Sequence, residues 1–105
     1  MKKNPKFFLT HILESINEIE NYLRGFSKEK FLKDSKTQNA VVRNLEIVGE
    51  ATRNLPAEFK RKYPDIPWRK ISGTRDKLIH QYFDVDLEIV WNTVNEDLPK
   101  LEMNL

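Results

Sequence analysis

Apolar residues recur at steps of three and four along four long stretches of this 105-residue sequence, and this spacing constrains the fold more than any other feature. Only three glycines and five prolines interrupt the chain, and no stretch alternates as a strand would. The first stripe stops just before Gly25 and consists of Phe8, Ile12, Ile16, Ile19 and Leu23. The pattern predicts an all-α, up-and-down bundle of four to five helices.

Short polar motifs predict where the next helices begin. "SKEKFLKD" is expected to form a short helix or turn capped by Ser27. Ser35 and Gln38 fit a capping box at the start of a long helix that Pro56 ends. The apolar stripe of this helix is Val41, Leu45, Val48, Ala51 or Thr52, and Leu55.

The second half of the chain is predicted to hold two further long helices. Residues 56–67 are expected to form a loop with one short helical turn, and residues 68–83 a helix. The last helix is expected to begin after Asp84 or Asp86, and Pro99 is expected to end or kink it. Its inward positions are Leu87, Val90, Trp91, Val94 and Leu98.

Length and composition favour one domain over residues 1–105, because a second core would not fit. The absence of cysteine excludes disulfides, thiolate catalysis and Cys-ligated zinc, and suits a reducing compartment. The N-terminal stretch begins basic, but its apolar residues soon alternate with acidic ones, unlike a signal peptide. No apolar run approaches the ~18 residues that span a membrane. We therefore expect a cytoplasmic, soluble protein with no membrane partner.

Charge is unevenly distributed along the sequence. Pro56 to Arg75 holds six basic residues against two acidic ones, a net of +4. Asp84 to Leu105 holds six acidic residues against one basic one, a net of −5. A solvated loop beside an acidic helix would explain both segments. A site for a phosphate-bearing ligand would also explain the basic one, and its candidate phosphate contacts are Lys60, Arg61, Lys62, Arg69 and Lys70.

The stretch "GTRDKLIHQYF" places Arg75, His80 and Tyr82 within eight residues. Histidine exchanges a proton near neutral pH, and the planar arginine cation can bind two phosphate oxygens. Together they can cleave RNA without a metal: a base takes the ribose 2′-OH proton, the alkoxide attacks phosphorus, and a cation stabilises the equatorial oxygens. No metal site is expected, because the two histidines are far apart and no paired-ligand spacing occurs. No cofactor is expected either.

Geometry limits how this motif can act. Arg75 and His80 are separated by about 140° around a regular helix, whereas Arg75 and Tyr82 nearly share a face. Either the long arginine side chain reaches around, the helix distorts near its end, or groups from two subunits meet. A two-subunit site would explain how so small a chain builds a cleft.

Structural roles are the alternative for each of these residues. A single histidine in a helix is more often structural than catalytic, and His11, which has no such neighbours, is interpreted as structural. Arg75 beside Asp76 can form a surface pair worth under ~1 kcal/mol. Tyr82 can be a core aromatic residue with a solvated hydroxyl.

"GTRDKLIHQY" resembles the Arg-x4-His-x-Tyr signature of the HepT-like toxins, within the HEPN superfamily of helical domains. "QNAVVRNLEIVGEATRNLP", "PDIPWRKISGTRDKLIHQY" and "VDLEIVWNTVNEDLPKLE" resemble further blocks of that family, in order and over nearly the whole chain. The resemblance implies a HEPN fold, a homodimer with its catalytic cleft at the interface, and metal-independent ribonuclease activity.

The resemblance also implies roles for single residues. Arg75 and His80 match the catalytic positions, and Tyr82 matches a tyrosine that is adenylylated by an MntA-type minimal nucleotidyltransferase antitoxin, which uses ATP and Mg²⁺. Asp76 stands where HEPN proteins often have Asn; it is expected to support the site by orienting His80 or pairing with Arg75.

Three functions compete on this sequence. The first is the endoribonuclease toxin of a type VII toxin–antitoxin pair, acting on RNA and not on DNA. The second is a non-enzymatic helical module that docks a nucleotidyltransferase. The third is a purely structural dimeric bundle. The joint presence of Arg75 and His80 favours the first, because neither of the others needs both.

Overall fold

The computed structural model describes the backbone of residues 4–80 and 86–104, and the side chains within 4–74 and 86–104. Across these residues the chain is helical and contains no strand, which confirms the predicted all-α class. The segments are α1 Pro5–Leu23, α2 Lys28–Leu32, α3 Ser35–Asn54, α4 Ala57–Arg61, α5 Trp68–His80, α6 Leu87–Asn92, the π-helix η1 Thr93–Asp97, and α7 Leu98–Asn104.

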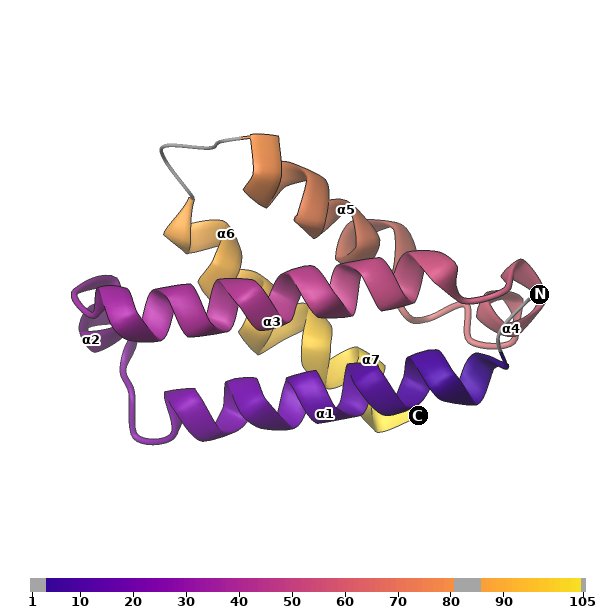
Figure 1. The fold of residues 1–105 in the computed structure, drawn as a ribbon, viewed down its shortest axis with the longest axis horizontal. Helices are drawn as coiled ribbons and strands as arrows, with labels where there is room; N and C mark the ends of the chain where they lie inside the picture. Colours follow the sequence, from indigo (N-terminus) through magenta and orange to yellow (C-terminus); the bar gives the residue numbers. More distant parts are fainter. Residues whose placement is uncertain (1–3, 81–85, 105) are drawn as a thin grey trace.

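Helix α3 lies in the middle of the bundle, between α1 on one side and α5 on the other (Figure 1). The C-terminal segment, formed by α6, η1 and α7, passes behind α3 and ends beside α1 (Figure 1). These four long segments run alternately in opposite directions, with the short α2 and α4 at the connections (Figure 1). The arrangement is the up-and-down bundle that the apolar stripes predict.

The predicted apolar stripes meet in one core. Ile12, Ile16 and Ile19 of α1 are buried, as expected from their spacing on one helix face. The predicted positions Leu87, Trp91 and Val94 are partly buried and pack against this core. Among the side chains that the structure describes, the other buried apolar residues are Phe31, Val41, Leu45, Val48, Ala51, Leu55, Ile66, Ile71, Val90, Leu98 and Leu101.

The turn after α1 and the start of α2 follow the sequence prediction. Gly25 has a φ of 78°, a conformation that residues with a Cβ rarely adopt, so the helix ends there. The Ser27 side chain accepts a hydrogen bond from the Lys30 backbone N–H at 3.1 Å and caps α2.

The predicted capping box at the start of α3 is wrong. The N-cap is Asp34, whose Oδ1 accepts from the Thr37 N–H at 3.0 Å. Gln38 instead donates its side-chain amide to the Phe31 carbonyl at 2.8 Å, which ties α2 to α3. Aspartate caps as well as serine does and adds a negative charge at the positive helix end, so the helix begins one residue earlier.

Pro99 does not end the last helix. The helix continues through Pro99 to Asn104 as α7, and the turn before it widens to the π-helix η1, in which the Leu98 N–H donates to the Thr93 carbonyl. Proline has no N–H and its ring crowds the carbonyl four residues before it. We attribute the wider turn to this crowding, which it relieves without breaking the helix.

Within the described residues, none of the helices combines the length and the apolar character that a membrane span requires.

Candidate functional site

Trp68 holds the start of the helix that carries the Arg/His motif. Its indole N–H donates to the backbone carbonyls of Lys60 and Tyr63, each at 3.0 Å, and its ring lies edge-on to Phe59. The first turn of α5 is therefore fixed against the end of α4. This contact brings together two parts of the basic segment that the sequence separates by a loop.

Arg75 and His80 both lie on α5, whose backbone is α-helical without a break from Trp68 to His80. Continuous helix places them about 140° apart around the axis. Of the three arrangements that the sequence leaves open, the long arginine reach and the two-subunit site are compatible with this backbone. The side chains of Arg75, Asp76 and His80 lie outside the described side chains, and Tyr82 lies outside the described residues. Their roles stay predictions.

The five candidate phosphate contacts gather around the α4–α5 junction. Arg61 and Lys62 are exposed at the end of α4, and Arg69 and Lys70 are exposed on the first turn of α5. Lys60 is half-buried, and this burial lowers the pKa of its ammonium group below the usual value. The five therefore lie on α4, directly after it, and on the first turn of α5, and their role as phosphate contacts stays a prediction.

Lys70 has a partner that the sequence analysis missed. Its Nζ lies 3.4 Å from Oδ1 of Asp97, a carboxylate at the end of η1 that is only 2% exposed. The second oxygen, Oδ2, is buried and has no hydrogen-bond partner among the described residues. One signal in the sequence was available: Asp97 lies three residues after Val94 and four before Leu101, on the apolar stripe of its helix.

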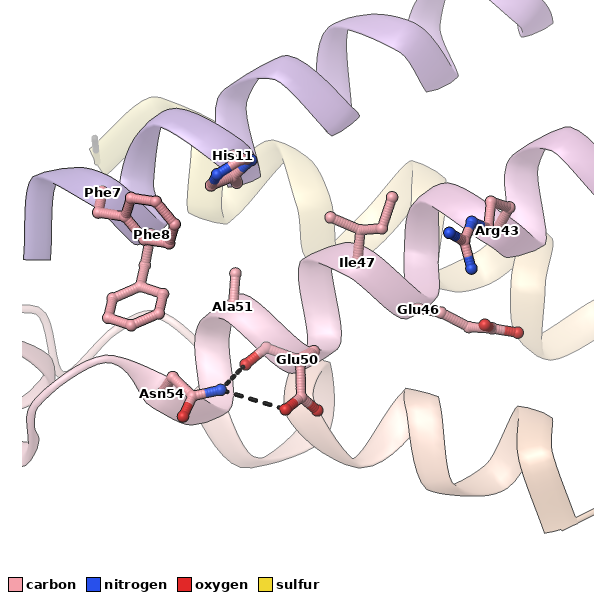
Figure 2. Close-up of a pocket in the computed structure, with 9 residues that line it drawn as sticks. All are labelled: Phe7, Phe8, His11, Arg43, Glu46, Ile47, Glu50, Ala51 and Asn54. Carbon is pink, nitrogen blue, oxygen red and sulfur yellow. Dashed lines mark hydrogen bonds between the residues drawn. The ribbon is translucent and has the colours of Figure 1, made fainter. Parts of the chain in front are cut away.

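A pocket of about 360 Å³ opens between the start of α1 and the outward face of α3 (Figure 2). His11, interpreted from the sequence as structural, is exposed on its α1 side and lies edge-on to Phe7, with ring centroids 4.7 Å apart. On the α3 side, Asn54 donates to Glu50 at 3.2 Å. The remaining lining residues are Phe8, Arg43, Glu46, Ile47 and Ala51.

The part of the chain that the structure describes contains no group of three or more His, Cys, Asp or Glu side chains placed to hold a metal ion.

Comparison with known proteins gives one consistent result. The profile of the family described as "Ribonuclease HepT-like" matches residues 12–105. The chain is 52% identical over 102 residues to a protein of Thermococcus cleftensis named "Probable ribonuclease HepT", covering 97% of this chain and 93% of that protein.

Two further relatives bear the name "Putative RNase". One, from Caldanaerobacter subterraneus subsp. tengcongensis, is 46% identical over 95% of this chain and 89% of its own. The other, from Methanocaldococcus jannaschii, is 46% identical over 93% of this chain and 81% of its own. No solved structure matches the chain.

Proposed function

The chain belongs to the HepT-like ribonuclease family, and on this basis we propose that it is an endoribonuclease that cleaves RNA by attack of a ribose 2′-hydroxyl on the adjacent phosphorus. The observation that carries the proposal is the extent of the family match, residues 12–105, which includes Arg75, His80 and the basic α4–α5 junction. Relatives named as ribonucleases over nearly their whole length support it.

His80 acts as the general base in this reaction. It takes the proton of the 2′-hydroxyl, the resulting alkoxide attacks phosphorus, and the 5′-oxygen leaves and takes up a proton. Arg75 stabilises the charge that grows on the equatorial phosphate oxygens. The products are a 2′,3′-cyclic phosphate and a 5′-hydroxyl, and no metal ion takes part. Asp76 supports the site by orienting His80 or pairing with Arg75.

RNA approaches along the basic surface at the α4–α5 junction. Four of its cations are exposed: Arg61, Lys62 and Arg69 can contact phosphates directly, and Lys70 can do so from its pair with Asp97. Each neutralised phosphate releases counterions, and binding should weaken as salt rises. Part of this surface lies on the first turn of α5, the helix that also carries Arg75 and His80.

The protein acts as the toxin of a type VII toxin–antitoxin pair, and Tyr82 is its switch. An MntA-like nucleotidyltransferase with ATP and Mg²⁺ transfers AMP to the Tyr82 hydroxyl: the phenol oxygen attacks the α-phosphorus and pyrophosphate leaves. The added phosphodiester is a bulky anion near Arg75. It covers the site and occupies the cation that the transition state needs.

Two copies of the chain form the active unit, a homodimer with its interface on parts of α3 and α5. Arg75 and His80 diverge on a continuous helix, and a second copy can complete the site. The outward face of α3 combines the half-buried Ile47 with charges of both signs, Arg43 and Glu46 (Figure 2). A two-fold contact needs such a self-complementary surface.

We expect the protein to act in the cytoplasm, where RNA and ATP are available. A chain without cysteine needs no oxidising compartment.

Product chemistry tests the reaction. Purified protein is incubated with end-labelled single-stranded RNA in excess EDTA, and the termini are analysed. Cleavage in EDTA that leaves 2′,3′-cyclic phosphate and 5′-hydroxyl ends is the expected result. Cleavage that stops in EDTA, or that leaves 5′-phosphate and 3′-hydroxyl ends, would exclude attack by the 2′-hydroxyl as the mechanism.

A further inference from the structure

A buried carboxylate holds one of the exposed cations of the basic surface. The Lys70 side chain is 57% exposed, yet its ammonium nitrogen lies 3.4 Å from Oδ1 of Asp97, whose side chain is 3% exposed. The ammonium therefore has one side against the protein interior and another toward solvent. Oδ2 of Asp97 is buried with no hydrogen-bond partner among the described residues. The proposed reaction assigns no role to this buried acid.

Burial makes this ion pair persistent. A carboxylate removed from water is costly unless a cation compensates it, and breaking a buried pair leaves that charge uncompensated. We expect Lys70 to turn into solvent less freely than an ordinary surface lysine, because Asp97 would then lose the cation that compensates it. A lysine side chain otherwise has much rotamer freedom, which a ligand contact must remove.

The backbone beneath Lys70 is held as well. The Thr74 hydroxyl donates to the Lys70 carbonyl at 2.9 Å, and Thr74 is itself 3% exposed on the core side of α5. Asp97 lies at the end of η1 and is 2% exposed, so its carboxylate is enclosed by the bundle. The backbone of Lys70 and its ammonium group are therefore both held by contacts with the bundle.

We propose that Asp97 is a positioning residue, which fixes the Lys70 ammonium as a preformed contact for an RNA phosphate. The inference rests on the proposed ribonuclease function and specifies how its substrate is bound. Because the ordering of Lys70 is complete before RNA arrives, the contact contributes more to affinity than a flexible surface cation does. Arg69 is the natural comparison, since it is exposed on the same helical turn and has no such carboxylate among the described side chains.

The direction in which Asp97→Asn changes RNA affinity distinguishes positioning of Lys70 from bulk electrostatics. Removing a negative charge beside a phosphate site should strengthen RNA binding if charge alone matters. If Asp97 positions Lys70, the isosteric Asp97→Asn should weaken binding, because the ammonium is released. Weaker RNA binding by a folded Asp97→Asn variant is opposite to the change that charge alone predicts, and a residue with only a structural role would not produce it.

Binding is measured by fluorescence anisotropy with a labelled single-stranded oligonucleotide carrying 2′-O-methyl riboses, which the proposed reaction cannot cleave. Asp97→Asn and Lys70→Gln should each weaken binding about tenfold, the effect of losing one hydrogen bond to a charged group. The double variant should be no weaker than either, because both remove the same contact. Lys70→Arg keeps a cation that can pair with Asp97 and should bind within about threefold of wild type.

Glu96 supplies the matched control, as an exposed carboxylate next to Asp97 in η1. Glu96→Gln should leave binding unchanged or slightly tighter. With cleavable RNA, Asp97→Asn should raise KM about tenfold and change kcat less than about twofold, since the contact is equally present in ground and transition states. A fall in kcat at constant KM would contradict a role in binding.

Asp97→Asn protein that folds and binds as tightly as wild type, or more tightly, overturns the inference. If Asp97→Asn does not fold, the RNA affinities of Arg69→Gln and Lys70→Gln are compared instead. Lys70→Gln should lose more affinity, and equal losses overturn the inference. Wild-type protein that neither binds nor cleaves RNA would overturn the proposed function together with this inference. That outcome is distinct from normal wild-type binding with an unaffected Asp97→Asn variant.

Discussion

Tyr82 follows His80 by two residues and Arg75 by seven, so by helical spacing it nearly shares a face with Arg75. Replacing it by Phe keeps the ring and removes the acceptor oxygen. Tyr82→Phe should fold normally and cleave RNA, yet resist silencing when coexpressed with the nucleotidyltransferase. Intact mass should show added AMP on wild-type protein and none on the variant. AMP still present on Tyr82→Phe, with loss of toxicity, would place the acceptor at another residue.

Residue types were more predictable than residue contacts. Arg75 and His80 stand out because few side chains can do their chemistry, and the sequence shows their spacing directly. Asp97 was counted from the sequence as one acid among several in a negative segment. Its importance depends on burial and on Lys70, which is distant in the chain, and both follow only from how η1 packs on α5.

At the scale of elements, the stripes of α1 and α3 were predictable because helical period and side-chain type together decide burial. The ends of elements were harder. Asp34 and Ser35 cap almost equally well, so the sequence could not choose between them. The π-turn before Pro99 was also missed, since proline can break, kink or widen a helix and tertiary packing selects among these.

The cap of α3 gives a direct test of this element. Asp34→Ala should lower the free energy of unfolding by about 1 kcal/mol, because the Thr37 N–H loses its partner and the helix end loses a favourable charge. Ser35→Ala, one residue later, should change it by less than about 0.5 kcal/mol. Urea denaturation measures both. The reverse order of the two effects would restore Ser35 as the cap.

The contact between α1 and α7 should make stability depend on pH. Burial raises the pKa of Glu102, and a hydrogen bond and charge repulsion from Glu20 raise it further. A raised pKa means that Glu102 favours the folded state when protonated, and this contribution is lost as pH rises through the folded-state pKa. Glu102→Gln should therefore raise Tm at pH 7 relative to wild type.

The same difference in Tm should shrink towards zero below about pH 4, where glutamate is protonated in both folded and unfolded chains. Thermal unfolding followed by circular dichroism across this range measures it. A Tm difference that does not vary with pH would show that the two carboxyl groups are not coupled.

At the scale of the whole molecule, four long segments build one core, while the outward face of α3 keeps Ile47 and opposite charges near solvent (Figure 2). A homodimer that uses this face should be disrupted by Ile47→Arg, which places a cation in a desolvated contact. Sedimentation velocity at micromolar concentration should show a dimer for wild type and a monomer for the variant. Leu32→Arg, at an exposed position on α2, is the control and should stay dimeric. A monomeric wild type would exclude the dimer.

The central claim is that this bundle cleaves RNA with His80 as base and Arg75 as transition-state cation. Single-turnover cleavage of labelled RNA in EDTA, compared between wild type and variants of matched helicity, tests it most directly. His80→Ala should abolish cleavage, and Arg75→Ala should slow it about 10²–10³-fold, as loss of a stabilising group in the transition state does. Arg24→Ala, an exposed arginine at the end of α1 bound to Asn21, should leave the rate unchanged. Wild-type rates in purified His80→Ala protein would contradict the account.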